Sequence, residues 1–378
     1  MNQAAEKTSF LATYLKPLVA PLSDPAVVEI AINPDGKVWV ETRGAEHMVE
    51  LMGVFYSPAQ ARDLATSIAS ATHGQISEKK PLVSGKIEMN GKPIRAQVVY
   101  PPVVDGGPSI TLRRYSEDQL TLGDIGLLHG ALIDLDAERQ AKAERVIALT
   151  QAGDIRAAMK LCIDERLNIM ISGGTSTGKT TFARALLALV TETERIVTIE
   201  DAFELFPPQP NRAMLKADRI PSSERTAAKL LETSLRMRPD RIILGELRGD
   251  ECKTFLDAIN TGHSGSFTTI HADTAQKALD RLALMVMSVG INMSFEEVRR
   301  YPRPASMSWC SLGGRTGGAG SNRCGCQITE PLEGICWSAS DGACMRKSFK
   351  AQRLIRSTES NRFTGCHGQP KIIGLPRS

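Results

Sequence analysis

Residues 173–180 read GGTSTGKT, and this stretch decides the fold. It follows an apolar run, LNIMIS at 167–172, that is typical of a buried strand, and it precedes a helical pattern, TFARALLALV at 181–190. A glycine-rich turn in this context directs backbone N–H groups around an anion, and the following helix adds its positive end. We therefore predict a loop that binds the phosphates of a nucleotide. The alternative is a glycine-rich turn without a ligand.

The residues of this loop have separate predicted roles. Lys179 is expected to bridge the β- and γ-phosphates, and the Thr180 hydroxyl is expected to hold Mg²⁺. A nucleoside triphosphate and Mg²⁺ are therefore expected at this loop, and the resemblance described below implies that the nucleotide is ATP. The predicted nucleotide-binding residues of the loop are Gly173, Gly174, Thr175, Ser176, Thr177, Gly178, Lys179, Thr180 and Thr181.

Acidic residues end two of the apolar runs that follow the loop. Glu200 and Asp201 close RIVTIED, and Glu246 closes RIILGE. Because strands of an open parallel sheet direct their carboxyl ends toward the ligand crevice, we expect these acids to converge on Mg²⁺ and the γ-phosphate, with Glu200 as a second candidate metal ligand. Phosphoryl transfer needs an oriented water, and Glu246 is the candidate that orients it. The alternative for any one of these acids is a solvated strand end.

Two histidines bracket a further apolar run in SFTTIHAD. His271 follows this run as the acids follow theirs, and we expect it to sense the γ-phosphate. His263 precedes the run, in the glycine-rich turn TGHSGS. A structural role is the alternative for both histidines.

The chain divides into unlike segments, since 378 residues exceed the length of one typical domain. Residues 1–115 are predicted to form an α+β domain, with a helix near 58–72 and strands at VVEIAIN, KVWVET, PIRAQVVY and SITLRRY. Residues 116–166 show charged helical patterns broken at Gly153 and Asp154, and we interpret them as a helical linker.

Residues 167–301 alternate apolar runs with amphipathic stretches of helical length. This alternation predicts an α/β fold, with a mainly parallel sheet covered by helices. Ser294 and Glu297 have the spacing of a helix capping box. Met285, Met287 and Met293 are predicted to fill the core between helices.

Composition and net charge do not indicate any particular class of binding partner. The 46 Lys and Arg residues nearly balance the 42 Asp and Glu residues, so the net charge of +4 does not indicate a nucleic-acid or anionic-membrane surface. The N-terminal residues lack the pattern of a signal peptide, and no run of about 18 apolar residues occurs. We expect a cytoplasmic protein that is at most peripheral to a membrane.

Four segments, in their order and spacing, resemble the motifs of the secretion traffic ATPases. They are GGTSTGKTT, RIVTIEDAFEL, RMRPDRIILGELRGDE and TGHSGSFTTIHAD, which resemble the Walker A, Asp, Walker B and His boxes of that family. The resemblance covers about residues 10–300 and is closest to the type IV secretion branch. It implies a RecA-like P-loop NTPase core, a smaller N-terminal α+β domain that clamps the nucleotide, and a ring of six subunits.

The resemblance also implies residue roles. Lys179 and Thr180 match the P-loop pair, Glu200 the catalytic acid of the Asp box, Glu246 the Walker B glutamate, and His271 the histidine of the His box.

Arginines complete the set that the resemblance implies. GKPIRAQVV and SITLRRYS resemble two strands whose arginines reach the nucleotide, which points to Arg95 and Arg113. The alternative for this pair is two solvated strand residues. The four arginines beside the Walker B strand compete for a role between subunits, and the sequence leaves their order open: Arg236, Arg238, Arg241 and Arg248.

The pattern changes after Tyr301. Residues 302–378 hold six of the eight cysteines, show almost no strand or helix period, and depart from the family. We predict a Cys- and Gly-rich tail without regular structure, and our hypothesis is that it is out-of-frame or otherwise acquired sequence. The alternative is a zinc site formed by cysteines with unusual spacing, namely Cys324, Cys326, Cys336, Cys344 or the Cys366–His367 pair.

The preferred function is a hexameric ATPase that powers a type IV secretion system at the bacterial inner membrane. Its implied partners are further copies of itself, inner-membrane channel subunits, and a protein or DNA–protein cargo, without sequence-specific nucleic-acid binding. The alternatives are a nucleotide-binding scaffold subunit that does not hydrolyse ATP, because of the altered tail, and a DNA translocase or helicase with the same core.

Overall fold

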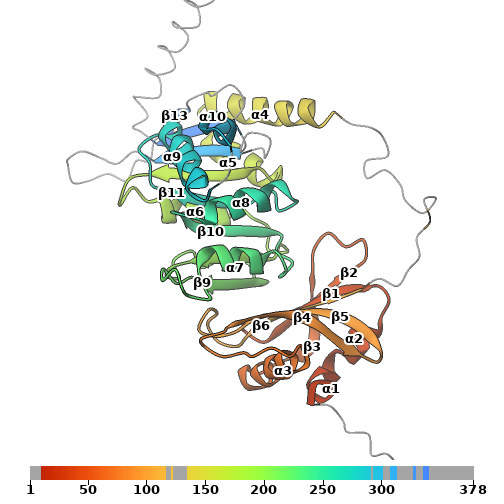
Figure 1. Ribbon diagram of the computed structural model, residues 1–378. Coiled ribbons are helices and arrows are strands. Elements are labelled where there is room, and N and C mark those ends of the chain that lie inside the picture. The colour runs from red at the N-terminus through yellow and green to blue at the C-terminus, as the bar shows by residue number, and fades with distance from the viewer. Residues whose placement is uncertain are drawn as a thin grey trace, which may run out of the picture.

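The computed structural model describes residues 10–115, 121, 134–290, 293–300, 307–312, 327–328 and 335–339. Two sheets organise these residues, one in the N-terminal part of the chain and one in the C-terminal part (Figure 1). Each sheet is covered by helices and has its own buried apolar cluster.

The N-terminal sheet has six antiparallel strands in the order β3-β2-β1-β6-β5-β4. Its strands are β1 (Val27–Ile32), β2 (Lys37–Thr42), β3 (Val49–Phe55), β4 (Leu82–Met89), β5 (Lys92–Val99) and β6 (Ser109–Arg114). Its helices are α1 (Phe10–Leu15), the short 3₁₀ helix η1 (Lys16–Leu18), α2 (Val19–Ser23) and α3 (Pro58–Ala71). The four strands and the helix predicted in residues 1–115 are confirmed.

Helix α3 begins at its expected signals. Ser57 and Gln60 form a capping box, in which Ser57 Oγ accepts from the Gln60 N–H at 3.3 Å and Gln60 Oε1 accepts from the Ser57 N–H at 2.9 Å. Leu64 and Ile68 on this helix pack with Ile30 of β1 in one buried cluster.

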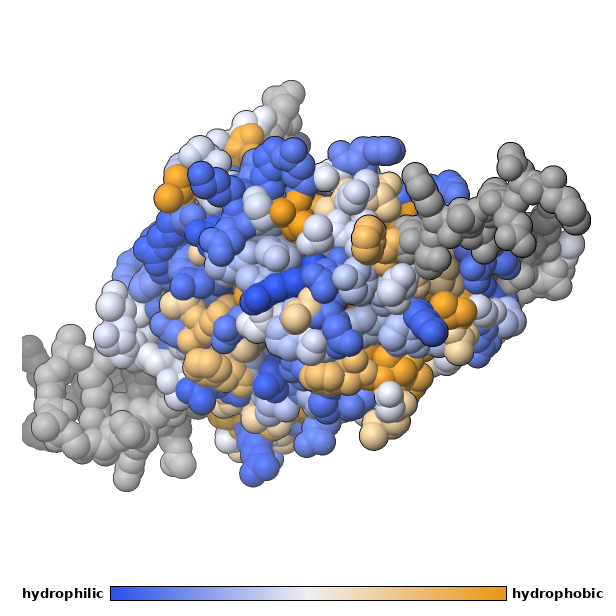
Figure 2. Space-filling view, turned by 90° about the horizontal axis from the view of Figure 1, so that it is seen from below, coloured by the Kyte–Doolittle hydropathy of each residue, from blue (hydrophilic) through white to orange (hydrophobic). Residues whose placement is uncertain are grey.

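Seen from the side of this domain, apolar residues are interspersed with hydrophilic ones on the surface (Figure 2).

The C-terminal sheet has the order β13-β14-β12-β7-β11-β10-β8-β9, and β12, β7, β11, β10, β8 and β9 run parallel. The strands are β7 (Asn168–Gly173), β8 (Ile196–Glu200), β9 (Arg212–Lys216), β10 (Arg241–Leu247), β11 (Phe267–Ile270), β12 (Met307–Leu312), β13 (Gln327–Ile328) and β14 (Ile335–Ala339). The helices are α4 (Leu135–Gln151), α5 (Ile155–Asp164), α6 (Lys179–Leu187), α7 (Ala227–Ser234), α8 (Glu251–Asn260), α9 (Ala275–Ser288) and α10 (Phe295–Arg300).

Side chains of the central strands alternate between the two faces of this sheet. On β10, Ile242 and Leu244 belong to a cluster with residues of α7, α8 and α9, whereas Ile243 belongs to a cluster with residues of α4, α5 and α6. Helices therefore cover both faces, as expected for a parallel sheet. The predicted α/β fold and its four strands are confirmed.

The helices that we assigned to a linker pack against the C-terminal sheet. α4 ends before Gly153, which has a φ of 84°, and α5 begins after Asp154, whose carboxylate accepts from the Ala157 N–H at 3.0 Å. The predicted break between two helices is present. Because Met159 of α5 shares a buried cluster with Ile169 of β7, we propose that the C-terminal domain begins N-terminal to residue 167.

Short strands occur in the segment where we expected no regular structure. β12 pairs in parallel with β7 from Met307↔Asn168 to Leu312↔Gly173, and β14 pairs with β12. This pairing occupies the backbone groups along one side of β7, which would otherwise form an open sheet edge. The other residues of 302–378 lie outside the described residues, as do the side chains of the zinc alternative.

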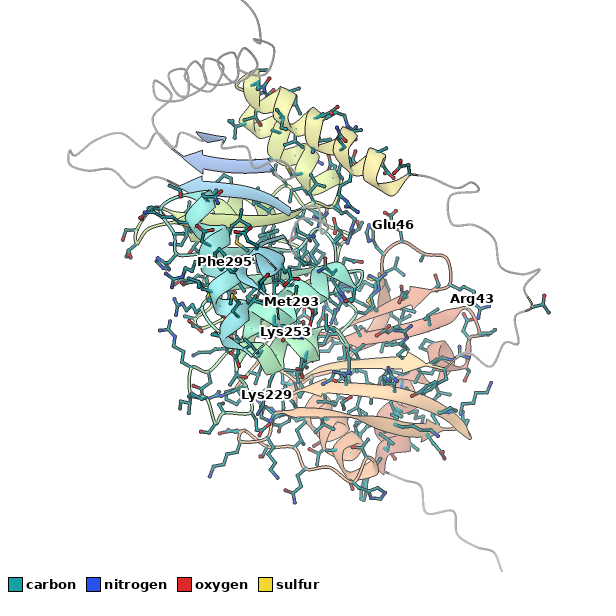
Figure 3. The ribbon with its side chains drawn as sticks, turned by 45° about the horizontal axis from the view of Figure 1, so that its top comes forward. Arg43, Glu46, Lys229, Lys253, Met293 and Phe295 are labelled. Atoms are coloured by element: carbon teal, nitrogen blue, oxygen red, sulfur yellow. The ribbon has the colours of Figure 1, made fainter. Side chains whose placement is uncertain are left out.

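Polar and apolar contacts join the two domains. Arg195, at the start of β8, is fully buried and donates through Nη1 to Asn33 Oδ1 at 2.6 Å and to Asn211 Oδ1. Arg238 donates to Glu41 Oε1 at 2.8 Å and to the Glu46 carbonyl at 3.2 Å. The β2–β3 turn that carries Glu46 projects toward the C-terminal domain (Figure 3).

No helix among the described residues is both long and apolar enough to cross a membrane.

Candidate active site

The glycine-rich loop lies between β7 and α6, as the sequence predicts. β7 ends at Gly173, and α6 begins at Lys179. Gly178 precedes the helix with a φ of 87°, a backbone conformation that glycine adopts without steric cost. Thr177 Oγ1 donates to the Gly174 carbonyl at 3.0 Å and closes the loop. The loop thus presents the N-terminus of α6 to the space above the strand ends.

Lys179 folds back onto this loop. Its Nζ donates to the carbonyl oxygens of Gly173 at 3.0 Å and Gly174 at 2.8 Å. Burial lowers the pKa of the Lys179 ammonium, and the nearby Glu246 carboxylate opposes this shift. The ammonium is therefore positioned at the loop, where a phosphate oxygen can replace a carbonyl as its partner.

A cavity of about 1190 Å³ opens beside the loop. Residues 175–181 form one wall. Glu200, Asp201, Glu246 and His271, each at the carboxyl end of a strand or directly after it, belong to the other walls. The structure therefore brings the predicted loop, acids and histidine to one cavity, and Gly173 and Gly174 lie at the base of the loop.

Glu246 and His271 lie side by side in this cavity. Glu246 Oε1 is 3.4 Å from His271 Nε2, and Glu246 Oε2 accepts from Arg248 Nη2 at 2.5 Å. Parallel pairing of β10 with β11 explains this proximity, because His271 follows β11 directly. The Glu246 carboxylate therefore lies between the His271 ring and the Arg248 guanidinium.

Glu200 has a different environment. Its side chain is buried, and its Oε2 accepts from the N–H groups of Glu204 at 2.9 Å and Leu205 at 3.0 Å. Its Oε1 accepts from Thr198 Oγ1 at 3.0 Å. Burial raises the pKa of Glu200, and the two backbone hydrogen bonds oppose this shift. Since a carboxylate oxygen accepts two hydrogen bonds, Oε1 retains one acceptor site for a metal or a water.

Asp201 is the residue that the sequence analysis left without a role of its own. Its Oδ2 accepts from Arg248 Nη1 at 2.9 Å, and from Arg219 through Nε at 3.0 Å and Nη2 at 2.6 Å. Its position directly after β8 is visible in the sequence. Its contacts with the two arginines are not visible in the sequence. Arg219, for example, approaches from the loop after β9.

Arg95 and Arg113 do not reach the loop within one chain. They are directly paired across β5 and β6, and both line a second cavity of about 250 Å³. Glu29 and the C-terminal-domain residues Arg236 and His263 line the same cavity. His263 precedes β11, whereas His271 follows it, so the two histidines lie at opposite ends of the strand. Only His271 contributes to the cavity beside the glycine-rich loop.

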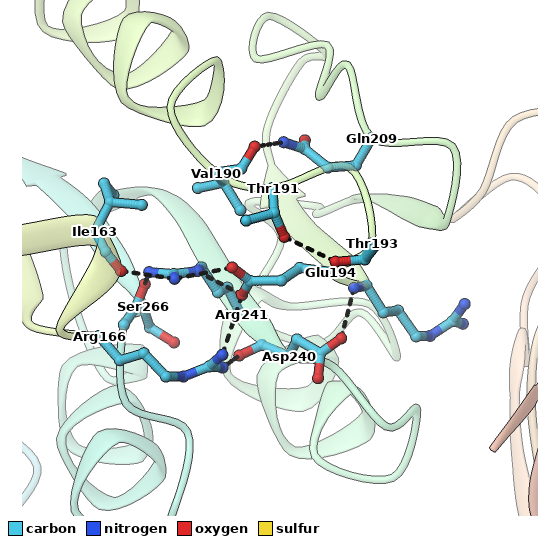
Figure 4. Close-up of polar contacts among 12 residues, drawn as sticks. Ile163, Arg166, Val190, Thr191, Thr193, Glu194, Gln209, Asp240, Arg241 and Ser266 are labelled. Carbon is cyan, nitrogen blue, oxygen red and sulfur yellow. Dashed lines mark hydrogen bonds and ion pairs between the residues drawn. The ribbon is translucent and has the colours of Figure 1, made fainter. Parts of the chain in front are cut away.

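The environments of the four competing arginines differ. Arg241 is buried and donates to both carboxylate oxygens of Glu194, at 2.7 and 3.0 Å, within a network that includes Arg166 and Asp240 (Figure 4). Arg238 forms ion pairs with Asp240 and with Glu41 of the N-terminal domain. Both side chains therefore have ion-pair partners within the chain. Arg248 lines the large cavity, and Arg236 and Arg238 line the small one.

A glycine-rich loop between a parallel strand and a helix, with strand-end acids beside its lysine, defines a P-loop NTPase with a RecA-like core. A family model described as "Type II/IV secretion system protein" matches residues 16–300. The chain therefore belongs to this family, and it is an ATPase.

Individual relatives agree with this assignment. The conjugal transfer protein TrbB of Rhizobium radiobacter is 38% identical over 268 residues, which cover 70% of this chain and 74% of that protein. The type IV secretion system protein VirB11 of Brucella suis biovar 1 is 32% identical over 307 residues, which cover 79% of this chain and 84% of that protein.

A solved structure shares the fold. The crystal structure of the VirB11 ATPase from the Brucella suis type IV secretion system, in complex with sulphate, has a TM-score of 0.68 and 32% sequence identity. The match covers 80% of this chain and 89% of that chain.

Proposed function

We propose that this ATPase hydrolyses Mg²⁺-ATP as a homohexamer and powers a type IV secretion system from the cytoplasmic side of the inner membrane. One observation carries the proposal: Lys179 at the loop shares a cavity with the Glu246–His271 pair. This arrangement combines a phosphate-binding cation with a carboxylate that can orient water.

The residues at the loop suit a triphosphate and its metal. Lys179 would exchange the carbonyls of Gly173 and Gly174 for phosphate oxygens. The Thr180 hydroxyl and Glu200 Oε1 offer the oxygen donors that Mg²⁺ prefers. Bound Mg²⁺ supplies charge neutralisation on the phosphates. Glu246 would orient the attacking water. His271, whose Nε2 is 3.4 Å from Glu246 Oε1, would orient the Glu246 carboxylate toward the γ-phosphate.

A ring is the natural assembly for this arrangement. Arg95 and Arg113 lie on the N-terminal domain, away from the loop of their own chain. We propose that they approach a nucleotide when the subunits close in a ring of six, where their guanidinium groups stabilise charge on the phosphates.

The proposed partners follow from the named relatives, a conjugal transfer protein and a type IV secretion system protein. They are inner-membrane channel subunits and a protein or DNA–protein cargo. We expect no sequence-specific binding of nucleic acid.

Steady-state phosphate release with Mg²⁺-ATP tests the enzymatic part of this proposal. Lys179→Ala should lower kcat at least 100-fold. Glu246→Gln should lower kcat by a similar factor while nucleotide binding persists, because the amide cannot serve as a carboxylate base or anion. Lys253→Ala is the matched control. Lys253 is labelled in Figure 3. It pairs with Asp257 on α8 and does not line the cavity.

Wild-type protein that binds nucleotide without releasing phosphate would contradict hydrolysis and favour the scaffold alternative. Light scattering after size-exclusion chromatography, with Mg²⁺-ATP present, tests the hexamer. A mass that stays at the 41.0 kDa of one chain would contradict the ring.

A further inference from the structure

The large cavity holds more carboxylates than cations. Among the described residues that line it, the basic side chains are Lys179, Arg219, Lys229 and Arg248. The acidic ones are Glu200, Asp201, Glu204, Asp218, Glu232, Glu246, Asp250 and Glu251. A triphosphate is itself strongly anionic. Its binding is therefore favoured if some of these cations exchange a carboxylate for a phosphate.

The four cations differ in what they would have to release. Lys179 is bonded to backbone carbonyls, and Lys229 is 3.2 Å from Glu224 at the cavity margin. Arg219 is bonded to Asp201. Arg248 alone among these four is bonded to Glu246, the proposed water-orienting residue.

The guanidinium of Arg248 spans two acids with its two terminal nitrogens. Nη1 donates to Asp201 Oδ2 at 2.9 Å, and Nη2 donates to Glu246 Oε2 at 2.5 Å. The planar fork of an arginine can therefore keep one partner while it changes the other. The Arg248 side chain is 43% exposed, so its free edge is accessible from the cavity.

The backbone of Arg248 is fixed although its side chain is accessible. Glu251 Oε1 accepts from the N–H groups of Arg248 at 2.5 Å and Gly249 at 2.9 Å, and Glu251 is buried. The turn between β10 and α8 thus holds the Arg248 Cα in place. A change of partner needs only side-chain rotation.

The charge of Arg248 also acts on Lys179. Burial is the main cause of the lowered pKa of Lys179; Glu246 opposes it, and Arg248 adds to it. Two cations thus lie within electrostatic range of each other near Glu246. An anion between them would relieve their repulsion.

We propose that Arg248 exchanges Glu246 for the terminal phosphate when ATP binds, while Asp201 keeps its hold on Nη1. The exchange brings positive charge to the γ-phosphate and frees Glu246 Oε2 to accept from water. Arg248 is then a catalytic residue, and Asp201 is its positioning residue. The inference rests on the proposed hydrolysis of ATP.

The experiment uses the full-length chain and two measurements. Calorimetry gives the dissociation constants for Mg²⁺-AMP-PNP and Mg²⁺-ADP, and phosphate release gives kcat. Arg248→Ala should lower kcat at least 100-fold and reduce the preference for AMP-PNP over ADP at least tenfold, with ADP affinity changed less than threefold. Arg248→Lys should recover part of the preference, because it restores a cation.

Asp201→Asn tests the positioning role. It should lower kcat about tenfold alone and cause no further loss when added to Arg248→Ala, because it acts through Arg248. Arg145→Ala is the matched control: Arg145 forms a surface ion pair with Glu165 at 2.8 Å, away from the cavity. It should leave kcat and both affinities within threefold.

The inference is overturned if Arg248→Ala keeps the wild-type preference for AMP-PNP over ADP, or if its kcat is unchanged or raised. Should Arg248→Ala fail to fold by circular dichroism, Arg248→Gln, which keeps length and hydrogen bonding without charge, is held to the same criteria. Wild-type protein without phosphate release would instead refute the proposed function, which separates the two failures.

Discussion

At the scale of single residues, Glu200 and Glu246 show how one sheet edge gives two carboxylates different chemistry. Glu200 ends β8, and Glu246 is the penultimate residue of the neighbouring parallel strand β10. Glu200 is 5% exposed and accepts two backbone hydrogen bonds, whereas the ion-pair partners of Glu246 are the side chains of Arg248 and His271. Backbone partners are fixed, but side-chain partners can change when a ligand binds. Glu246 is therefore better suited to respond to ATP.

A third buried carboxylate, Glu29, makes stability depend on pH. Burial raises the pKa of Glu29 to about 7 from 4.5, although Arg113 opposes the shift. The folded state therefore favours the neutral acid. Its contribution to stability is fully present below pH 4.5 and is lost as the pH rises through about 7.

Glu29→Gln removes this penalty because the amide stays neutral. We expect the free energy of unfolding to rise by about 1–3 kcal/mol at pH 8, and the difference from wild type to shrink toward zero at pH 5. Urea denaturation at the two pH values measures it. Glu138→Gln, at an exposed position of α4, is the control; an equal effect of Glu29→Gln at both pH values would contradict the prediction.

At the scale of elements, the apolar pattern predicted four strands of each sheet, but it did not predict β3 or β4 of the N-terminal domain. β7, β8, β10 and β11 are short apolar runs between turn residues, and each is where the sequence predicts it. β9 was not predicted, because RAMLK at 212–216 alternates polar and apolar residues over only five positions. β12 was missed because its order depends on pairing with β7, a contact distant in sequence.

The candidate site shows the same limit. The loop and its acids were predictable because each lies at or directly after the carboxyl end of a strand. His263 and His271 lie in different cavities because they are at opposite ends of β11, which the sequence alone does not show. The contact of Arg241 with Glu194, which places Arg241 in a buried network, is likewise known only from the structure. The Arg248 contacts depend on side-chain directions that no spacing in the sequence specifies.

Helix α5 gives a prediction at this scale. Asp154 caps the helix by accepting from the Ala157 N–H at 3.0 Å. Asp154→Ala should lower the free energy of unfolding by about 1 kcal/mol, because an N–H at the helix start loses its partner. Asp154→Asn retains an acceptor and should cost only a few tenths of that. Chemical denaturation compares them, and equal losses for both variants would argue against the capping role.

At the scale of the whole molecule, the domains meet through a buried polar cluster. Asn33 is 1% exposed and donates through Nδ2 to Asn211 Oδ1 at 3.0 Å, while its Oδ1 accepts from Arg195. Val103 and Val104 of the N-terminal domain pack in a buried apolar cluster that is formed mostly by residues of the C-terminal domain. The interface therefore combines apolar burial with directional hydrogen bonds.

Asn33→Ala should weaken this interface without unfolding either domain. Loss of its hydrogen bonds leaves the buried Arg195 guanidinium with fewer acceptors, at a cost of about 1–3 kcal/mol. Hydrogen exchange at residues 33–37 and 209–212 should become about tenfold faster or more, since about 1.4 kcal/mol corresponds to a factor of ten. Gln140→Ala, on the exposed surface of α4, is the control. Unchanged exchange in Asn33→Ala would count against the interface.

The strand β8 joins this interface to the cavity without an intervening loop. Arg195 precedes the strand and contacts Asn33, and Glu200 ends it at the cavity wall. Five residues at about 3.3 Å each give the strand a length of roughly 17 Å, and this length is fixed while the strand stays paired in the sheet. If the N-terminal domain moved Arg195 along the axis of β8, Glu200 at the cavity wall would therefore move with it.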